Sequence, residues 1–211
     1  INPYRDALNT IDSFYEQLEE PEKLIPKPMD IETALSVVSQ VRKQSQDLTA
    51  EKEQLQAQHS EVLDSLKIIR PFKNLDYDIS SILKFKYIHF RFGRIEKQYL
   101  QKFEKYIYDN LDTLFIKCGE DEQYIYGIYF VPEHQAHKVH AVYSSMHFER
   151  IYMPDNYEGT AAEAFQALDS RHRDIHTKLN ANTDAFQKLF SDNKEKIVSA
   201  KAALSSFSSS F

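Results

Sequence analysis

Three histidines lie close together in the second half of the chain. His134, His137 and His140 are spaced three residues apart, and Glu133 precedes the first of them. On a helix, His134 and His137 could share a face and bind a transition metal if a carboxylate or a thiolate completed the ligand set. His134 and His140 are about 600° apart around such a helix, so all three cannot point at one ion. The pattern therefore favours surface histidines on a solvated helix face, and we expect no metal site.

The residues that could act as nucleophiles lack the partners that such chemistry needs. Cys118 is the only cysteine, and no histidine base with an orienting group lies near it in the sequence. Glu120 to Glu122 follow Gly119 in an expected hairpin turn, where carboxylates are normally solvated. The segment from Arg91 to Arg94 has one glycine and does not match a phosphate-binding loop. We therefore expect no catalytic residue and no cofactor, and one cysteine excludes an intrachain disulfide.

One aromatic strand loosely resembles those of RNA-recognition folds. Tyr126 to Val131 has the aromatic spacing, but Ile125 stands where those folds have a lysine or arginine. Residues 84 to 158 carry ten Lys or Arg against eleven Asp or Glu, whereas RNA-binding lobes usually carry a positive excess. An RNA-binding module is therefore the least favoured of the binding functions considered. We interpret these aromatic residues mainly as sheet core and expect no nucleic-acid partner.

The composition is that of an ordinary soluble domain. Of the 211 residues, 42% are hydrophobic and 27% are charged, with a formal net charge of -6. An acidic chain is a poor general binder of nucleic acid or anionic membranes. No apolar run approaches the roughly 20 residues that span a bilayer, so we expect no direct membrane contact. The chain starts at Ile1 rather than at a methionine, and we expect it to be a trimmed piece of a longer protein.

Two long stretches contain neither glycine nor proline: residues 31 to 69 and residues 160 to 211. The first predicts a long helix, because apolar residues recur in it every seven positions, as in a coiled-coil seam. This seam comprises Ala34, Val41, Leu48, Leu55, Val62 and Ile69. The alternate core column is weaker because its middle members are polar; it comprises Val38, Ser45, Lys52, His59 and Leu66.

The second stretch provides a partner for that helix. Its core positions step four and three residues apart, with a one-residue shift of phase near Asn193. They are Ala161, Phe165, Leu168, His172, Ile175, Leu179, Asn182, Phe186 and Leu189, and then Ile197, Ala200, Leu204 and Phe207. The economical interpretation is an antiparallel hairpin within one chain. The alternative is a stand-alone coiled-coil adaptor, in which two exposed helices dimerise with a second chain.

The segment between the two helices has the pattern of a mixed lobe. Its expected elements are the strand 85–92, the helix 96–110, the strands 113–118 and 123–131, the helix 132–146 and the strand 148–153. This β-α-β-β-α-β order is the ferredoxin-like arrangement. The predicted fold class is therefore α+β: a long antiparallel two-helix coiled coil that carries a small ferredoxin-like lobe at its tip.

The chain divides accordingly into four segments. Residues 1–30 would form an N-terminal helix over 2–20 and a linker, with Asn2 as the helix cap and Pro3 in the first turn. Residues 31–70 would form the outgoing coiled-coil helix and residues 71–158 the distal lobe. Residues 159–211 would form the returning helix, which ends in a frayed serine-rich tail.

Short motifs at both ends of the lobe match those of one known family. They are Phe85 to Ile88 with Arg91 to Ile95, Phe148 to Pro154 with Gly159-Thr160, and Ile68 to Phe72. In these motifs, over roughly residues 31 to 200, the chain resembles subunit I of V-type ATP synthases, the bacterial and archaeal counterpart of the eukaryotic subunit a. It departs from the family at Ala161, where a proline commonly follows the Gly-Thr pair.

The resemblance implies a non-catalytic stator component of a rotary ATPase. Such a region links the membrane ion-translocating sector to the peripheral stalks and resists rotor torque. It lies at the cytoplasmic face of the membrane, as the soluble domain of a membrane protein, and binds the peripheral-stalk heterodimer. We expect the chain alone to be monomeric. The motifs are structural, so no catalytic residue can be carried across.

The docking face is predicted from charge alone. Arg91, Arg94 and Lys97 lie on the first expected strand of the lobe and at the start of its first helix. Exposed arginines suit acidic helical partners. We therefore expect these three residues to take part in partner binding.

Overall fold

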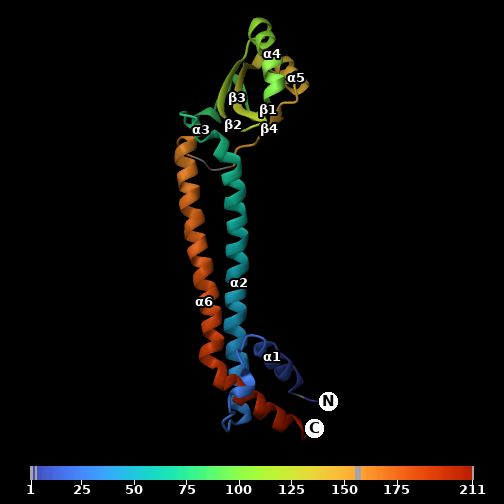
Figure 1. Cartoon of the computed structure of the whole chain (residues 1–211), viewed down its shortest axis with the longest axis vertical. Helices are drawn as coiled ribbons and strands as arrows, with labels where there is room; N and C mark the ends of the chain where they lie inside the picture. The colour runs from blue at the N-terminus through green and yellow to red at the C-terminus, as the bar shows by residue number, and fades with distance from the viewer. Residues whose placement is uncertain (1, 3, 155–157, 211) are drawn as a thin grey trace. The chain divides into compact units, whose positions relative to one another are not determined.

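The computed structural model describes residues 2, 4–154 and 158–210. The chain forms two compact units, Ile1–Gln58 with Ile175–Phe211, and His59–Asp174. The long helices α2 (Ile31–Ile69) and α6 (Ala161–Ser208) contribute to both units and pack against each other within one chain (Figure 1). Together with a four-stranded antiparallel sheet and short helices, they confirm the predicted α+β class. Among the described residues, no helix is long and apolar enough to cross a membrane.

In the first unit, the predicted seam forms the core between α2 and α6. Ala34 and Val41 from α2 pack with Ile197, Ala200 and Leu204 from α6, and all five are buried. Farther along α6, the buried Asn182 donates a hydrogen bond from Nδ2 to the carbonyl oxygen of Leu48, at 2.9 Å. A buried amide of this kind fixes the register of two paired helices.

The polar column of α2 does not lie wholly in the seam. Ser45 is half-buried, but Lys52 is exposed, so its predicted core position is wrong. A lysine ammonium is strongly hydrated, and burying it without a partner would cost several kcal/mol, on the order of what a buried charge costs in other proteins. On α6, Phe207 is also exposed rather than buried in the seam (46% exposed).

The N-terminal helix α1 (Arg5–Tyr15) is shorter than the predicted span 2–20. Ile11 and Phe14 are its buried residues, and the Phe14 ring lies 5.7 Å from that of Phe190. Asn2 accepts a hydrogen bond from the N–H of Tyr4 through Oδ1 and so caps the turn before the helix. The predicted role of Pro3 lies outside the described residues.

The second unit has the predicted β-α-β-β-α-β order. Its elements are β1 (Ile88–Glu96), α4 (Lys97–Asn110), β2 (Leu114–Glu120), β3 (Tyr124–Pro132), α5 (Ala136–Ser145) and β4 (Glu149–Arg150). The strands are ordered β2-β3-β1-β4 and every pair is antiparallel. This is the strand order of the ferredoxin-like arrangement, with β2 and β4 at the two edges.

Helices α4 and α5 cover one face of the sheet (Figure 1). The core beneath them includes Ile107 from α4, Val139 from α5 and Tyr129 from β3. The opposite face is covered near its middle by Phe72, from the short helix η2 (Arg70–Phe72) that follows α2. The Phe72 ring lies 5.4 Å from that of Phe92, in edge-to-face geometry. Both faces of the sheet therefore bury aromatic side chains.

The strand ends differ from their predicted positions for local reasons. β1 begins at Ile88 rather than Phe85, because the preceding residues follow the short helix α3 (Ile79–Ile82) instead of pairing with the sheet. β4 covers two residues instead of six. β2 continues to Glu120 through a register shift between Lys117 and Gly119. The predicted helix 132–146 opens with the 3-10 turn η3 (Glu133–Gln135) before α5.

Two glycines lie opposite each other in the middle of the sheet. Gly93 of β1 pairs with Gly127 of β3, and Gly93 also pairs with Arg150 of β4. A Cβ on Gly93 would lie 2.2 Å from Cζ of Phe148 and 2.4 Å from the carbonyl oxygen of Glu149. The absence of a side chain therefore allows the segment before β4 to lie directly against β1.

The two ends of the lobe are joined by backbone contacts. Asp78 and Thr160 form an isolated β-bridge, and the N–H of Ile79 donates to the carbonyl oxygen of Gly159 at 3.0 Å. The Asp78 carboxylate also caps α3 by accepting from the N–H of Ser80. These bonds hold the segment after α2 beside the start of α6.

The helix pair contains a histidine layer within the second unit. Nε2 of His59 on α2 lies 3.0 Å from Nε2 of His172 on α6, and the ring centroids are 4.8 Å apart. Both residues occupy core positions of the predicted seam. The two imidazoles are hydrogen-bonded to each other at a position where apolar side chains would otherwise pack.

We expect the double substitution His59→Leu with His172→Leu to stabilise the second unit by about 1–2 kcal/mol, because leucine buries more apolar surface in a seam. Urea denaturation followed by tyrosine fluorescence measures the change. His59→Leu alone is the matched control, because it leaves His172 half-buried with no imidazole partner. A double variant less stable than both the single variant and the parent would contradict this account of the layer.

Candidate functional site

The structure separates the three residues predicted to bind a partner. Arg91 and Arg94 lie on β1 with their side chains on opposite faces of the sheet, because strand side chains alternate. Nε of Arg94 lies 2.7 Å from Oε2 of Glu149. Nζ of Lys97, at the start of α4, lies 3.2 Å from Oε2 of Glu120. Two of the three cations are thus already paired with carboxylates of the lobe.

Arg91 lies among other cationic side chains. It is opposite Tyr129 of β3, and Arg150 of β4 is opposite Gly93, two residues farther along β1. The guanidinium of Arg150 lies 4.3 Å from the centre of the Tyr152 ring. Within the described part of the chain, neither Arg91 nor Arg150 has a carboxylate within ion-pair distance. The positive charge of these two arginines is therefore not neutralised by described residues.

Histidines complete this cluster. Nδ1 of His140, on α5, lies 2.6 Å from the hydroxyl oxygen of Tyr129. The His89 ring on β1 lies 6.0 Å from that of His140. His134 and His137 are exposed, as predicted, but His140 is half-buried and the prediction of a surface position is wrong for it. No group of three metal-ligating side chains occurs in the described ranges.

Electrostatics keep the buried members of the cluster neutral. The pKa of His140 is lowered to about 4, first by burial and then by the positive charges of Arg91, His89, Arg150 and His137. Burial raises the pKa of Tyr129 to about 12, although Arg91 acts in the opposite direction. At neutral pH, therefore, the uncharged hydroxyl of Tyr129 is hydrogen-bonded to the uncharged imidazole of His140, close to two arginines.

We call these five residues, His89, Arg91, Tyr129, His140 and Arg150, the cationic cluster. Arg91 lies opposite Tyr129 in the register of β1 and β3, and burial keeps the Tyr129 hydroxyl protonated. The hydroxyl proton can then point to Nδ1 of His140, and this tautomer leaves the Nε2–H as a donor. Guanidinium and imidazole donors that converge without a carboxylate are suited to binding an oxyanion.

Sequence reasoning found Arg91 but missed the rest of the cluster. The alternation of His89 and Arg91 was a signal, because it places both on one face of a strand. Their meeting with Tyr129 and Arg150 depends on the register of three strands, which the sequence does not specify. The helical turn that brings His140 over Tyr129 is likewise a result of packing.

The other chemical candidates do not form a reactive site. Cys118 is buried, and burial raises the pKa of its thiol to about 12, so the thiol stays protonated at neutral pH. Among the turn carboxylates, Glu120 forms ion pairs with Lys97 and Lys117. Asp121 accepts hydrogen bonds from the N–H groups of Gln123 and Tyr124. Both act in local structure.

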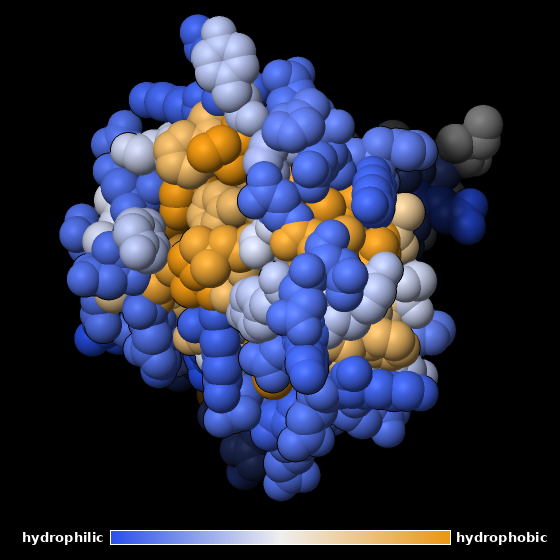
Figure 2. All heavy atoms as spheres, turned by 90° about the horizontal axis from the view of Figure 1, so that it is seen from above, coloured by the Kyte–Doolittle hydropathy of each residue, from blue (hydrophilic) through white to orange (hydrophobic). Residues whose placement is uncertain are grey.

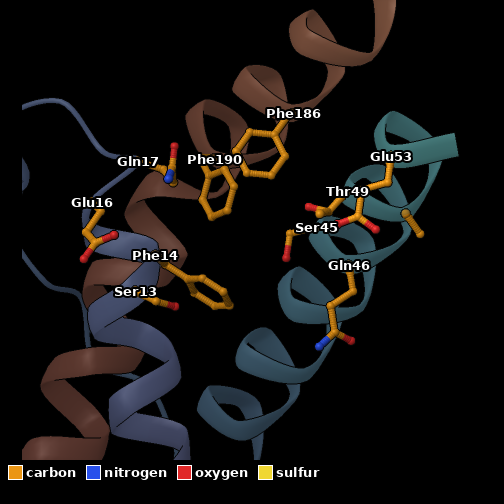
Figure 3. Close-up of a pocket in the computed structure, with 11 residues that line it drawn as sticks. Ser13, Phe14, Glu16, Gln17, Ser45, Gln46, Thr49, Glu53, Phe186 and Phe190 are labelled. Carbon is orange, nitrogen blue, oxygen red and sulfur yellow. The ribbon is translucent and has the colours of Figure 1, made fainter. Parts of the chain in front are cut away.

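A groove of about 390 Å³ lies in the first unit, between α1, α2 and α6 (Figure 3). The rings of Phe14, Phe186 and Phe190 line one side of it, and Ser45 and Thr49 of α2 face them (Figure 3). Its polar side chains do not include a histidine or a cysteine. The groove therefore has the chemistry of a packing surface and not that of a reactive centre.

Apolar surface gathers in patches bounded by hydrophilic side chains when the molecule is seen from above (Figure 2). In the second unit, the exposed large apolar residues include Leu83, Phe85, Ile88 and Leu114. Phe85 also lies 6.2 Å from Phe130 of β3. The Phe72 ring of η2 lies 6.3 Å from that of Tyr126, so two aromatic residues of β3 contact neighbouring rings of the lobe.

Comparison with solved structures finds similar folds. One is the crystal structure of the cytoplasmic N-terminal domain of subunit I, homolog of subunit a, of V-ATPase. The TM-score is 0.51 at 13% sequence identity, and the match covers 99% of this chain and 73% of that chain. No protein-family model matches the sequence. No curated protein matches it either. The likeness therefore shows a shared fold.

Proposed function

We propose that this chain is a non-catalytic stator component of a rotary V-type ATPase or ATP synthase. It would link the membrane ion-translocating sector to the peripheral stalks and resist rotor torque at the cytoplasmic face of the membrane. The observation that carries the proposal is the similarity to the subunit I domain over 99% of this chain. The motifs around Phe85 and Phe148 support the same family.

The physical properties of the fold suit such a role. Helices α2 and α6, of 39 and 48 residues, pack together along a shared seam. Helical hydrogen bonds run parallel to the axis, so paired helices resist stretching and bending. The lobe supplies half-buried cations, and Arg91 is the one of the three predicted docking residues without a described carboxylate.

We expect saturable one-to-one binding when the chain is titrated with the purified peripheral-stalk heterodimer from the same organism. Isothermal titration calorimetry at two salt concentrations measures it, and a charge-based contact should weaken at higher salt. Absence of binding at concentrations up to roughly 1 mM would contradict a stalk contact made by this region.

The competing function, a coiled-coil adaptor that dimerises, predicts a different mass in solution. Because α2 and α6 cover each other's seams in one chain, we propose a monomer. Light scattering coupled to gel filtration distinguishes the two. A tight dimer would favour the adaptor.

A further inference from the structure

Among the described residues, no strand pairs with the outer edge of β1 over its first half. β4 pairs with β1 only at Gly93 and Arg94, and the last bond on that side joins the N–H of Ile151 to the carbonyl oxygen of Phe92. In an antiparallel strand, backbone groups that face one edge recur at every second residue. The N–H and C=O of Phe90 therefore face the same edge as those of Phe92, beyond the end of β4. No backbone bond from a described residue outside β3 reaches them.

The two faces beside this open edge differ in chemistry. On the helix-covered face lie His89 and Arg91, with Arg150 across from the next position of β1. On the other face lies Phe90, whose ring is 6.4 Å from the ring of Phe85. Phe85 is 46% exposed and Ile88 is 45% exposed. An added strand would thus meet cations on one face and apolar rings on the other.

We infer that this edge, Ile88 to Arg91 with the cationic cluster, is a docking site for an extended segment of a protein partner in which acidic residues alternate with apolar ones. The backbone of the segment would bond that of Phe90, as in strand addition to other sheet edges. Its acidic side chains would lie at Arg91, Arg150 and His89. Its apolar side chains would lie against Phe85 and Phe90.

Charge complementarity selects the acidic partner. Arg91 and Arg150 have no described carboxylate, and a carboxylate accepts two parallel bonds from one guanidinium. The chain as a whole carries a net charge of -6, which disfavours a long polyanion such as RNA beyond this local patch. One or two carboxylates match the charge of two arginines.

Docking of an acidic segment should change the protonation of His140. The groups that face it are His89 and Arg91 from β1, Tyr129 from β3, Arg150 from β4 and His137 from its own helix. None of them is a carboxylate. A docked carboxylate would offset these positive charges and raise the pKa of His140 from about 4 toward its ordinary value. The complex therefore takes up a proton, and affinity increases as the pH falls.

The test uses the full 211-residue chain and a short fluorescent peptide in which glutamate alternates with valine. Fluorescence anisotropy should show saturable binding that is about fourfold tighter at pH 5.5 than at pH 7.5. A peptide of the same composition with its glutamates grouped together should bind at least about tenfold more weakly, because it cannot separate the two faces. His140→Gln should remove this pH dependence, whereas His134→Gln, on the exposed turn η3, should retain it.

Four variants locate the contact. Arg91→Gln should weaken binding by about tenfold, as expected for a charge-assisted pair, whereas Lys97→Gln should leave it unchanged because Lys97 is paired with Glu120. Phe90→Pro should abolish binding, since proline removes the N–H at the open edge. Phe90→Ala is its matched control, because it loses the ring but retains that N–H. Thermal melting of each variant checks that it is folded.

Several outcomes would overturn the inference. Equal binding of the grouped peptide would reduce the contact to general charge attraction. If Phe90→Pro and Phe90→Ala weakened peptide binding equally, strand addition at Phe90 would be excluded. Competition by inorganic phosphate as effective as that of the peptide would make the cluster a free-anion site. Because the peptide assay contains no stalk, its result and that of the stalk titration are independent, and either proposal can fail alone.

Discussion

Replacing Gly93 by valine should lower the melting temperature of the second unit by about 10 °C, the largest effect we expect from a single substitution. A Cβ at this position would lie 2.4 Å from the carbonyl oxygen of Glu149, which is backbone and cannot move without displacing β4. It would also lie 2.2 Å from the Phe148 ring, which packs against Tyr129 in the core. Overpacking against backbone costs about 3 kcal/mol or more.

Differential scanning calorimetry measures this change. The matched control is Leu114→Val, which introduces the same residue at an exposed position of β2, where the expected shift is within about 2 °C. If Gly93→Val melted at the temperature of this control, the close approach of Phe148 and Glu149 to β1 would be contradicted. Faster hydrogen exchange of the β4 amides in Gly93→Val would identify β4 as the strand that is displaced.

Acid should destabilise the second unit through His140, between about pH 6.5 and pH 4. Its pKa is lowered to about 4 in the folded chain, so the unfolded chain binds more protons in this window. The free energy of unfolding therefore falls as the pH drops through the window, and it is fully retained above it. Because the imidazole is only half-buried, solvent screening reduces the effect to about 1–2 kcal/mol.

Urea denaturation followed by tyrosine fluorescence at pH 7 and pH 4.5 measures this dependence. His140→Gln should flatten it, while His134→Gln, an exposed histidine of η3, should leave it unchanged. The carboxylate of Asp121, whose pKa is lowered by the N–H groups of Tyr124 and Gln123, also contributes to acid lability, but below about pH 4. An equal slope in both variants would exclude His140 as the source.

The long helices could be predicted because their signals are local and repeated. An uninterrupted stretch without glycine or proline, with an apolar residue at every seventh position from Ala34 to Ile69, leaves few alternatives to a paired helix. The element order of the lobe was predictable because each of its helices and strands has its own local pattern of apolar residues. Lys52 shows the limit: the spacing placed it in the core, but the hydration of its ammonium group outweighed the pattern.

The cationic cluster could not be predicted because it is a product of strand register. A shift of one residue in the pairing of β1 with β3 would move Arg91 to the face of Arg94 and away from Tyr129. Charge alone therefore grouped Arg91 with Arg94 and Lys97, although each of the latter has its own carboxylate. The short length of β4, which leaves Phe90 without a described strand partner on that side, is likewise a tertiary outcome.

The bridge between Asp78 and Thr160 has a consequence for the order in which the chain can fold. The first unit is discontinuous, since its two parts are separated by the whole of residues 59–174. Closing so long a loop in a random chain carries an entropy cost that grows with its length. A lobe that folds first, with Asp78 beside Thr160 and Ile79 bonded to Gly159, has already closed that loop. The remaining halves of α2 and α6 can then pair from this junction onward, turn by turn, as neighbours rather than as distant segments.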